Sequence, residues 1–190
     1  ALHHMGYPET NLNLGCPSGT VTAKGKGAGL LARPEQLRAF LDAVFSAAAG
    51  PVSVKTRVGF SSPEEFPALL ELFSQYPIAR LIVHPRVRED FYRGSPRLEC
   101  FTLAAARSRA PLCYNGDLFR PADAQALTAR FPGVSQLMFG RGLLADPALA
   151  RKLRGGPAAD LEELRAFHAL LWSGYRAMMP GPKPALARMK

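Results

Sequence analysis

Short apolar runs alternate along the chain with segments whose apolar residues recur at the three- and four-residue spacing of a helix. Five strands are predicted, at residues 11–14, 51–58, 80–84, 111–115 and 136–140. Between them, helical spacing is found at residues 37–45, 66–73, 103–107 and 122–131. This alternation of strands and helices predicts parallel strands that are joined by crossover helices.

Polar residues at the ends of the predicted strands distinguish between two parallel architectures. A doubly wound sheet would place a glycine-rich phosphate loop after its first strand. Here functional groups instead end one strand after another, which is typical of a (β/α)8 barrel. In chain order these groups are Cys16, Lys55, Arg57, His84, Asn115, Gly140 and Arg141.

We therefore predict an α/β fold in the form of a partial (β/α)8 TIM barrel. A complete barrel takes about 250 residues, whereas residues 1–154 hold only the five predicted strands. Either the sheet is open, or three β/α units of the barrel lie outside this chain. The chemistry of the strand ends favours the second alternative, in which the five strands are strands 4–8 of a barrel. After Gly155-Gly156-Pro157 the composition shifts, and residues 158–190 are predicted to begin a separate helical domain.

Composition and charge narrow the class of protein. No apolar run reaches the roughly 18 residues that span a bilayer, so we expect no membrane segment. Cys16, Cys100 and Cys113 are odd in number and far apart, which argues against disulfides or a zinc site and favours a reducing cytoplasm. The net charge of +9 attracts polyanions, and it fits a generic basic surface as well as nucleic-acid binding.

Cys16 is the first candidate for chemistry. It stands in Asn13-Leu14-Gly15-Cys16-Pro17-Ser18, a constrained turn at the predicted barrel mouth. A thiol there is able to act as a nucleophile, a metal ligand or a proton donor, and the lack of a matching Cys or His cluster argues against a metal. A buried structural cysteine is the alternative, which the flanking Asn, Gly and Pro disfavour.

Two cations and a histidine are predicted to lie on the same barrel face. Lys55 and Arg57 are two residues apart on one strand and therefore point the same way. Inside a barrel they would require an anionic or polar ligand, whereas on an edge strand they would be surface residues. His84 ends the next strand, and although a lone histidine is often structural, its place beside Lys55 favours a functional role.

Glycine-containing turns after the last two strands are candidates for a phosphate site. Asn115-Gly116-Asp117 and Gly140-Arg141-Gly142 are each compatible with plain turns. In a barrel, however, the loops after strands 7 and 8 commonly bind a phosphate, which here would fall to Gly116, Gly140 and Arg141. The basic, glycine-rich segment at residues 24–29 lacks the spacing of a P-loop and is explained as well by a flexible loop.

Six motifs, in order and at matching spacing, resemble those of tRNA-dihydrouridine synthases. They are Asn-Leu-Gly-Cys-Pro-Ser at 13–18, Gly-Ala-Gly-Leu-Leu at 27–31, Val-Lys-Thr-Arg-Val-Gly at 54–59, Val-His-Pro-Arg at 83–86, Tyr-Asn-Gly-Asp at 114–117 and Gly-Arg-Gly at 140–142. The resemblance covers about residues 8–154 and extends toward the end of the chain. Pro85 departs from the family pattern, since many members carry Gly after the histidine.

The resemblance implies a flavoprotein oxidoreductase of tRNA processing, which binds FMN tightly and uses NADPH to reduce uridine in tRNA to 5,6-dihydrouridine. It implies that Cys16 donates a proton to C5 of a uracil that receives a hydride at C6, and that Arg57 lies near this base. The flavin would be held by the other matched positions, namely Asn13, Lys55, His84, Asn115, Gly116, Asp117, Gly140 and Arg141.

The same resemblance implies that the partner is tRNA and that residues 158–190 start the family's helical tRNA-binding domain. We expect a monomer without a metal. The family's opening strand and most of that domain would lie outside this chain. Two other classes stay open. A flavin barrel that acts on free pyrimidines, such as a dihydroorotate dehydrogenase-like enzyme, needs neither the +9 charge nor the helical tail. An inactive RNA-binding fragment would need no flavin.

Overall fold

The computed structural model describes residues 2 and 5–189, and a single parallel sheet lies within residues 10–138. The strands are β1 (Thr10–Leu14), β2 (Val52–Arg57), β3 (Leu81–His84), β4 (Leu112–Asn115) and β5 (Gln136–Met138), each within two residues of its predicted range. Every strand pairs with the next one along the chain, in the order β1-β2-β3-β4-β5. The order therefore has no reversal point of the kind that defines a doubly wound sheet.

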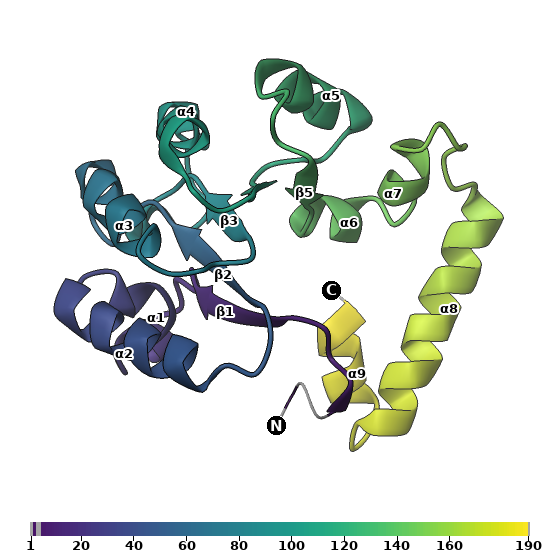
Figure 1. The fold of residues 1–190 in the computed structure, drawn as a ribbon. Coiled ribbons are helices and arrows are strands. Elements are labelled where there is room, and N and C mark those ends of the chain that lie inside the picture. Colours follow the sequence, from purple (N-terminus) through teal and green to yellow (C-terminus); the bar gives the residue numbers. More distant parts are fainter. Residues whose placement is uncertain (1, 3–4, 190) are drawn as a thin grey trace. The chain divides into compact units, whose positions relative to one another are not determined.

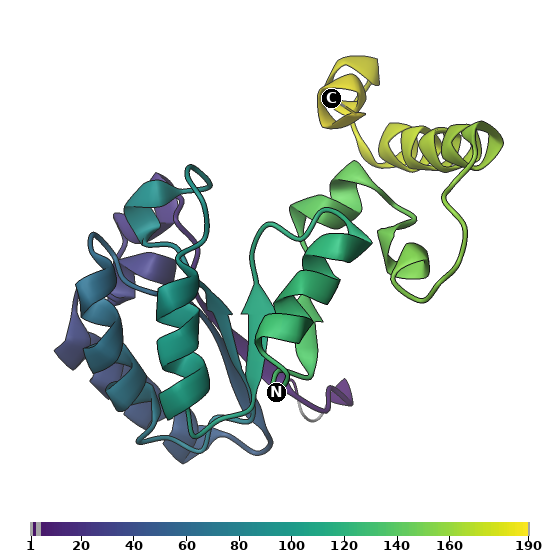
Figure 2. The same ribbon diagram turned by 90° about the horizontal axis from the view of Figure 1, so that it is seen from above.

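Helices connect the strands and cover one face of the sheet (Figures 1 and 2). The longer ones are α2 (Pro34–Ala47), α3 (Phe66–Phe73), α4 (Leu98–Arg107) and α5 (Pro121–Arg130). Pro34 and Pro121 stand in the first turn of their helices, where the missing N–H costs no hydrogen bond. None of the helices in the described residues is both long enough and apolar enough to cross a membrane.

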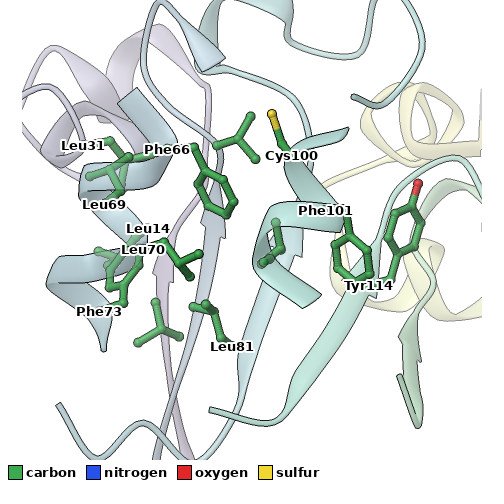
Figure 3. Packing of buried hydrophobic residues seen from close by; sticks show 14 of the residues in the cluster. Leu14, Leu31, Phe66, Leu69, Leu70, Phe73, Leu81, Cys100, Phe101 and Tyr114 are labelled. Atoms are coloured by element: carbon green, nitrogen blue, oxygen red, sulfur yellow. The ribbon is translucent and has the colours of Figure 1, made fainter. Parts of the chain in front are cut away.

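The alternation of side chains along each strand separates the hydrophobic core from the opposite face. Leu14, Val54, Val83 and Tyr114 point toward the helices and belong to the buried cluster. The helices contribute large side chains to this cluster, and Figure 3 shows Phe66, Phe73 and Phe101 among them. The residues between these strand positions, which include the polar ones singled out from the sequence, therefore lie on the face turned away from the helices.

The chain divides into two compact units, residues 1–142 and 143–190. The helix α6 (Arg141–Ala145) runs across this division, and the second unit contains α7 (Leu149–Lys152), α8 (Leu161–Met178) and α9 (Pro182–Met189). Asp160 caps α8 by accepting a hydrogen bond from the Glu163 N–H at 2.8 Å, and Arg151 pairs with the Glu163 carboxylate. The prediction that a tRNA-binding domain begins at residue 158 stays a prediction.

We expect Phe101→Ala to lower the free energy of unfolding by about 3–5 kcal/mol, because it leaves a cavity in the centre of the core. The Phe101 ring is fully buried and packs edge-on against Tyr114 at 4.9 Å and Phe131 at 5.0 Å between ring centroids. Urea unfolding of the purified protein measures the effect. Phe40→Ala is the matched control, since Phe40 is 38% exposed on α2, and equal losses in the two variants would contradict the packing described.

Candidate functional site

A pocket of about 310 Å³ lies where the strands of the sheet end. Because the strands are parallel and neighbours in register, their C-terminal ends meet at one edge of the sheet. Ten residues were singled out from the sequence, and all of them line this pocket: Asn13, Cys16, Lys55, Arg57, His84, Asn115, Gly116, Asp117, Gly140 and Arg141. No group of three or more His, Cys, Asp or Glu side chains is placed to hold a metal ion in the part of the chain that the structure describes.

Cys16 sits in a turn whose shape is set from two sides. The Asn13 Oδ1 accepts a hydrogen bond from the Gly15 N–H at 3.1 Å, and the Cys16 carbonyl accepts one from the Ala28 N–H at 3.0 Å. Gly27 has φ +56°, and a Cβ there would lie only 2.9 Å from the Cys16 Cβ. Residues 27–29 are buried and absent from the pocket lining, so the glycine-rich segment supports the cysteine turn by close packing.

Lys55 is a cation on the pocket wall without a carboxylate to balance it. It is the register partner of Asn13, and no Asp or Glu within the described residues forms an ion pair with it. Burial, and after it the positive charge of Arg57, lower the pKa of Lys55 from 10.5 to about 8. A buried ammonium of this kind is stabilised by an electron-rich ligand.

Arg57 lines the pocket, but its donors are bound to backbone carbonyls. Its Nε donates to the Gly15 carbonyl at 3.0 Å, Nη1 to Val87 at 2.8 Å and Nη2 to Phe91 at 2.6 Å. The side chain is 1% exposed, and burial lowers the pKa of its guanidinium. Arg57 thus ties the cysteine turn to the β3–α4 loop (residues 85–97), and its role toward a target base stays a prediction.

The last two strands contribute an asparagine side chain and two glycines to the pocket. Asn115 Nδ2 donates to the Met138 carbonyl at 2.9 Å and so joins β4 to β5 at the pocket. A Cβ on Gly116 would lie 3.2 Å from the Tyr114 hydroxyl and 3.4 Å from His84 Cδ2, so this glycine lets the loop pass close to the histidine. Gly140, in contrast, has open space around the position of a Cβ.

Asp117 is held between two arginines. Its Oδ1 accepts from Arg86 Nη1 at 2.9 Å and from Arg141 Nη2 at 2.5 Å, while Oδ2 accepts from Arg86 Nη2. The Arg141 guanidinium also lies over the Tyr92 ring, 4.4 Å from its centroid. The desolvation of Asp117 raises the pKa of its carboxyl, but the two arginines outweigh it and the net pKa is lowered. Asp117 therefore stays ionised and orients Arg141.

Two polar contributors to the site, Arg86 and Tyr92, were not selected from the sequence, and neither were the apolar lining residues Leu118, Phe119, Met138 and Phe139. Tyr92 lines the pocket, and Arg86 lies fully buried behind it, in contact with both His84 and Asp117. The available signal was the position of Arg86, two residues after the histidine that ends a strand. An arginine two residues after a strand-end histidine does not by itself indicate whether its side chain points into solvent or into the protein interior.

Known proteins resemble this chain over most of its length. The sequence profile of the family described as Dihydrouridine synthase matches residues 2–171. A probable tRNA-dihydrouridine synthase of Staphylococcus epidermidis is 33% identical over 181 residues, which cover 92% of this chain and 55% of that protein. The corresponding Staphylococcus aureus protein is 32% identical over 180 residues, covering 92% of this chain and 54% of its own length.

A third relative is the tRNA-dihydrouridine(16) synthase of Cupriavidus necator, 33% identical over 157 residues, which cover 80% of this chain and 48% of that protein. The chain thus spans about half the length of the curated relatives it matches.

Lys55→Met should stabilise the fold at neutral pH. The pKa of Lys55 is about 8 in the folded protein and 10.5 in the unfolded chain. Between pH 8 and pH 10.5 the side chain is therefore protonated in the unfolded chain and mostly neutral in the folded protein. The free energy of unfolding of the wild type rises with pH over this range, because the unfolded state binds more protons. Below pH 8 the wild type carries the full cost of the buried charge. We expect Lys55→Met to gain about 1–3 kcal/mol at pH 7, with the gain vanishing toward pH 10.5.

Chemical unfolding of both proteins across this pH range measures the difference. Lys24→Met is the matched control, because Lys24 is exposed, and it should stay within about 0.5 kcal/mol of the wild type. A gain for Lys55→Met that is absent at pH 7, or that grows with pH, would contradict the described burial of Lys55.

Proposed function

This chain belongs to the dihydrouridine synthase family, and on that premise we propose that its pocket is the flavin and uridine site of a cytoplasmic tRNA-dihydrouridine synthase. The proposed reaction reduces uridine in tRNA to 5,6-dihydrouridine, with FMN as the tightly bound cofactor and NADPH as the reductant. The observation that carries the proposal is the convergence of ten predicted residues on one pocket at the C-terminal ends of parallel strands. The family favours tRNA over a free pyrimidine as the substrate.

We further propose that the sheet corresponds to strands 4–8 of a (β/α)8 barrel and that residues 158–190 begin a helical tRNA-binding domain. The strand order supports the first part, since each strand of a barrel pairs with the next in sequence. The coverage supports it too, because the chain corresponds to about half of its relatives. The net charge of +9 suits a polyanionic partner.

The charges of the pocket fit a cofactor that carries a phosphate. Three cationic side chains line it, Lys55, Arg57 and Arg141, against one carboxylate, Asp117, which leaves a net charge of +2. Arg141 and the open backbone at Gly140 would hold the phosphate, and Asn13 with Lys55 would contact the ring system. The bound flavin supplies the hydride chemistry, and the protein supplies position, charge and protons.

The residues of the chain then have distinct roles. The uracil must leave its stack to enter the pocket, and a hydride received at its C6 leaves negative charge to be protonated at C5. Cys16, held at the wall by its turn, would donate that proton from its thiol S–H. Lys55 would stabilise negative charge that develops in the pocket.

A direct assay combines the purified protein with FMN, NADPH and an unmodified tRNA transcript, and detects dihydrouridine by mass spectrometry. We expect product with the wild type, and a rate lower by about 10²–10⁴ for Cys16→Ala, which removes the proton donor. FMN binding by Cys16→Ala should be unchanged, because the phosphate is proposed to lie at Arg141 and Gly140 and the ring system at Asn13 and Lys55.

Cys100→Ala is the matched control, since Cys100 is buried in α4 outside the pocket, and it should keep wild-type activity. Full activity of Cys16→Ala would remove its role as proton donor. Reduction of a free pyrimidine, with tRNA left unmodified, would overturn the proposed substrate in favour of the other flavin barrels.

A further inference from the structure

Arg86 is the most completely hydrogen-bonded side chain behind the pocket. It stands two residues after the end of β3, is fully buried and does not line the pocket itself. Its Nε donates to the Arg93 carbonyl at 3.1 Å, and Nη2 donates to the Gly94 carbonyl and the Asp117 carboxylate. Nη1 contacts Asp117 Oδ1 at 2.9 Å and His84 Nε2 at 3.1 Å. All five N–H groups of this guanidinium therefore have an acceptor.

The contact with Arg86 determines the tautomer of His84. A guanidinium has donors and no acceptor, so His84 Nε2 must accept this hydrogen bond. The proton of the neutral ring is then on Nδ1, because the partner of one ring nitrogen sets the state of the other. His84 lines the pocket, so a ligand that forms a hydrogen bond with its Nδ1–H must offer an acceptor atom.

His84 is held neutral by its surroundings. Lys55 and Arg57 face it from β2, Arg86 from the end of β3 and Asp117 from the loop after β4. Burial is the largest effect, the three cations add to it, and together they lower the pKa of His84 to about 3 against the opposing effect of Asp117. The tautomer set by Arg86 therefore persists across the physiological pH range.

Arg86 is also linked to Arg141, because both arginines bind the carboxylate of Asp117. Asp117 binds Arg86 with both oxygens and shares Oδ1 with Arg141. Asp117 has φ +40°, a left-handed conformation that is unfavourable for a residue with a side chain. The two-point pairing with Arg86 offsets that strain and keeps the carboxylate where it orients Arg141.

We propose that Arg86 is a positioning residue of this pocket, which fixes the proton of His84 on Nδ1 and holds the Asp117 carboxylate that carries Arg141. It acts through these two residues and needs no contact of its own with a ligand. The inference rests on the proposed function only in taking His84 and Arg141 as the residues that meet the cofactor. Phosphate and ring carbonyl oxygens of a flavin are acceptors, as the Nδ1–H of His84 requires.

Nitrogen-15 NMR of the histidine rings tests the inference, since it distinguishes a protonated from an unprotonated ring nitrogen. The His84 signals are assigned by their loss in His84→Gln. In the wild type we expect the proton on Nδ1 at neutral pH, a result that needs neither flavin nor turnover. A proton on Nε2 in the wild type would overturn the inference, whatever the variants do.

Two variants separate positioning from general support of the fold. Arg86→Met removes the donor, so His84 should shift toward the Nε2–H tautomer that a free imidazole prefers, and FMN binding should weaken about tenfold or more. Arg86→Lys keeps a donor without the two-point geometry, and should retain the tautomer better than the methionine variant. Arg97→Met is the control, because Arg97 pairs with Asp90 in the same loop without a hydrogen bond to His84.

An unchanged tautomer in folded Arg86→Met would overturn the inference. If Arg86→Met does not fold, the tautomer of the wild type decides, because a proton on Nε2 is incompatible with a guanidinium that donates to this nitrogen. Failure of the proposed function is a separate result, since a wild type that binds no FMN but carries the proton on Nδ1 would contradict the flavin site and leave the role of Arg86 intact.

Discussion

Two buried guanidinium groups hold the loop that walls the pocket, and the geometry of the site depends on them. Arg57 binds the carbonyls of Gly15, Val87 and Phe91, and Arg86 binds those of Arg93 and Gly94. A buried charge is tolerated only when its donors are satisfied, so each guanidinium is bound to one arrangement of the chain around it. Arg57 thereby connects the cysteine turn after β1 to the β3–α4 loop, which carries Tyr92, and Arg86 connects the same loop to Asp117 after β4.

The same positive charge that suits the pocket to a phosphate ligand opposes the stability of the protein without one. Lys55 keeps no carboxylate partner in the described residues, and its lowered pKa reports the cost of burying it. Asp117 forms ion pairs with Arg86 and Arg141. An anionic ligand would therefore stabilise Lys55 more than it stabilises these two arginines. A pocket whose charges are balanced only by a bound ligand is expected to lower the stability of the ligand-free protein in this way.

The strands and the pocket residues at the strand ends were predicted because both follow from a local rule, whereas Asn13 and Asp117 were assigned to the pocket through the family resemblance. Residues two apart on a strand share a face, and parallel strands end at one edge, so Lys55, Arg57 and His84 could be assigned to the same site. The partners of Arg57 and the inward turn of Arg86 could not be predicted. They depend on the path of the β3–α4 loop, which contacts distant in the chain determine. The packing of Gly27 against Cys16 was missed for the same reason.

A flavin site at the strand ends is tested most directly by the visible absorbance spectrum of the purified protein after incubation with FMN and exhaustive dialysis, with Arg141→Met and Arg120→Met in parallel. A flavin band near one FMN per chain in the wild type and in Arg120→Met, whose arginine is 77% exposed outside the pocket, and its loss in Arg141→Met, is the predicted result. No retained band in the wild type, or an equal band in all three proteins, would contradict a flavin site at the strand ends.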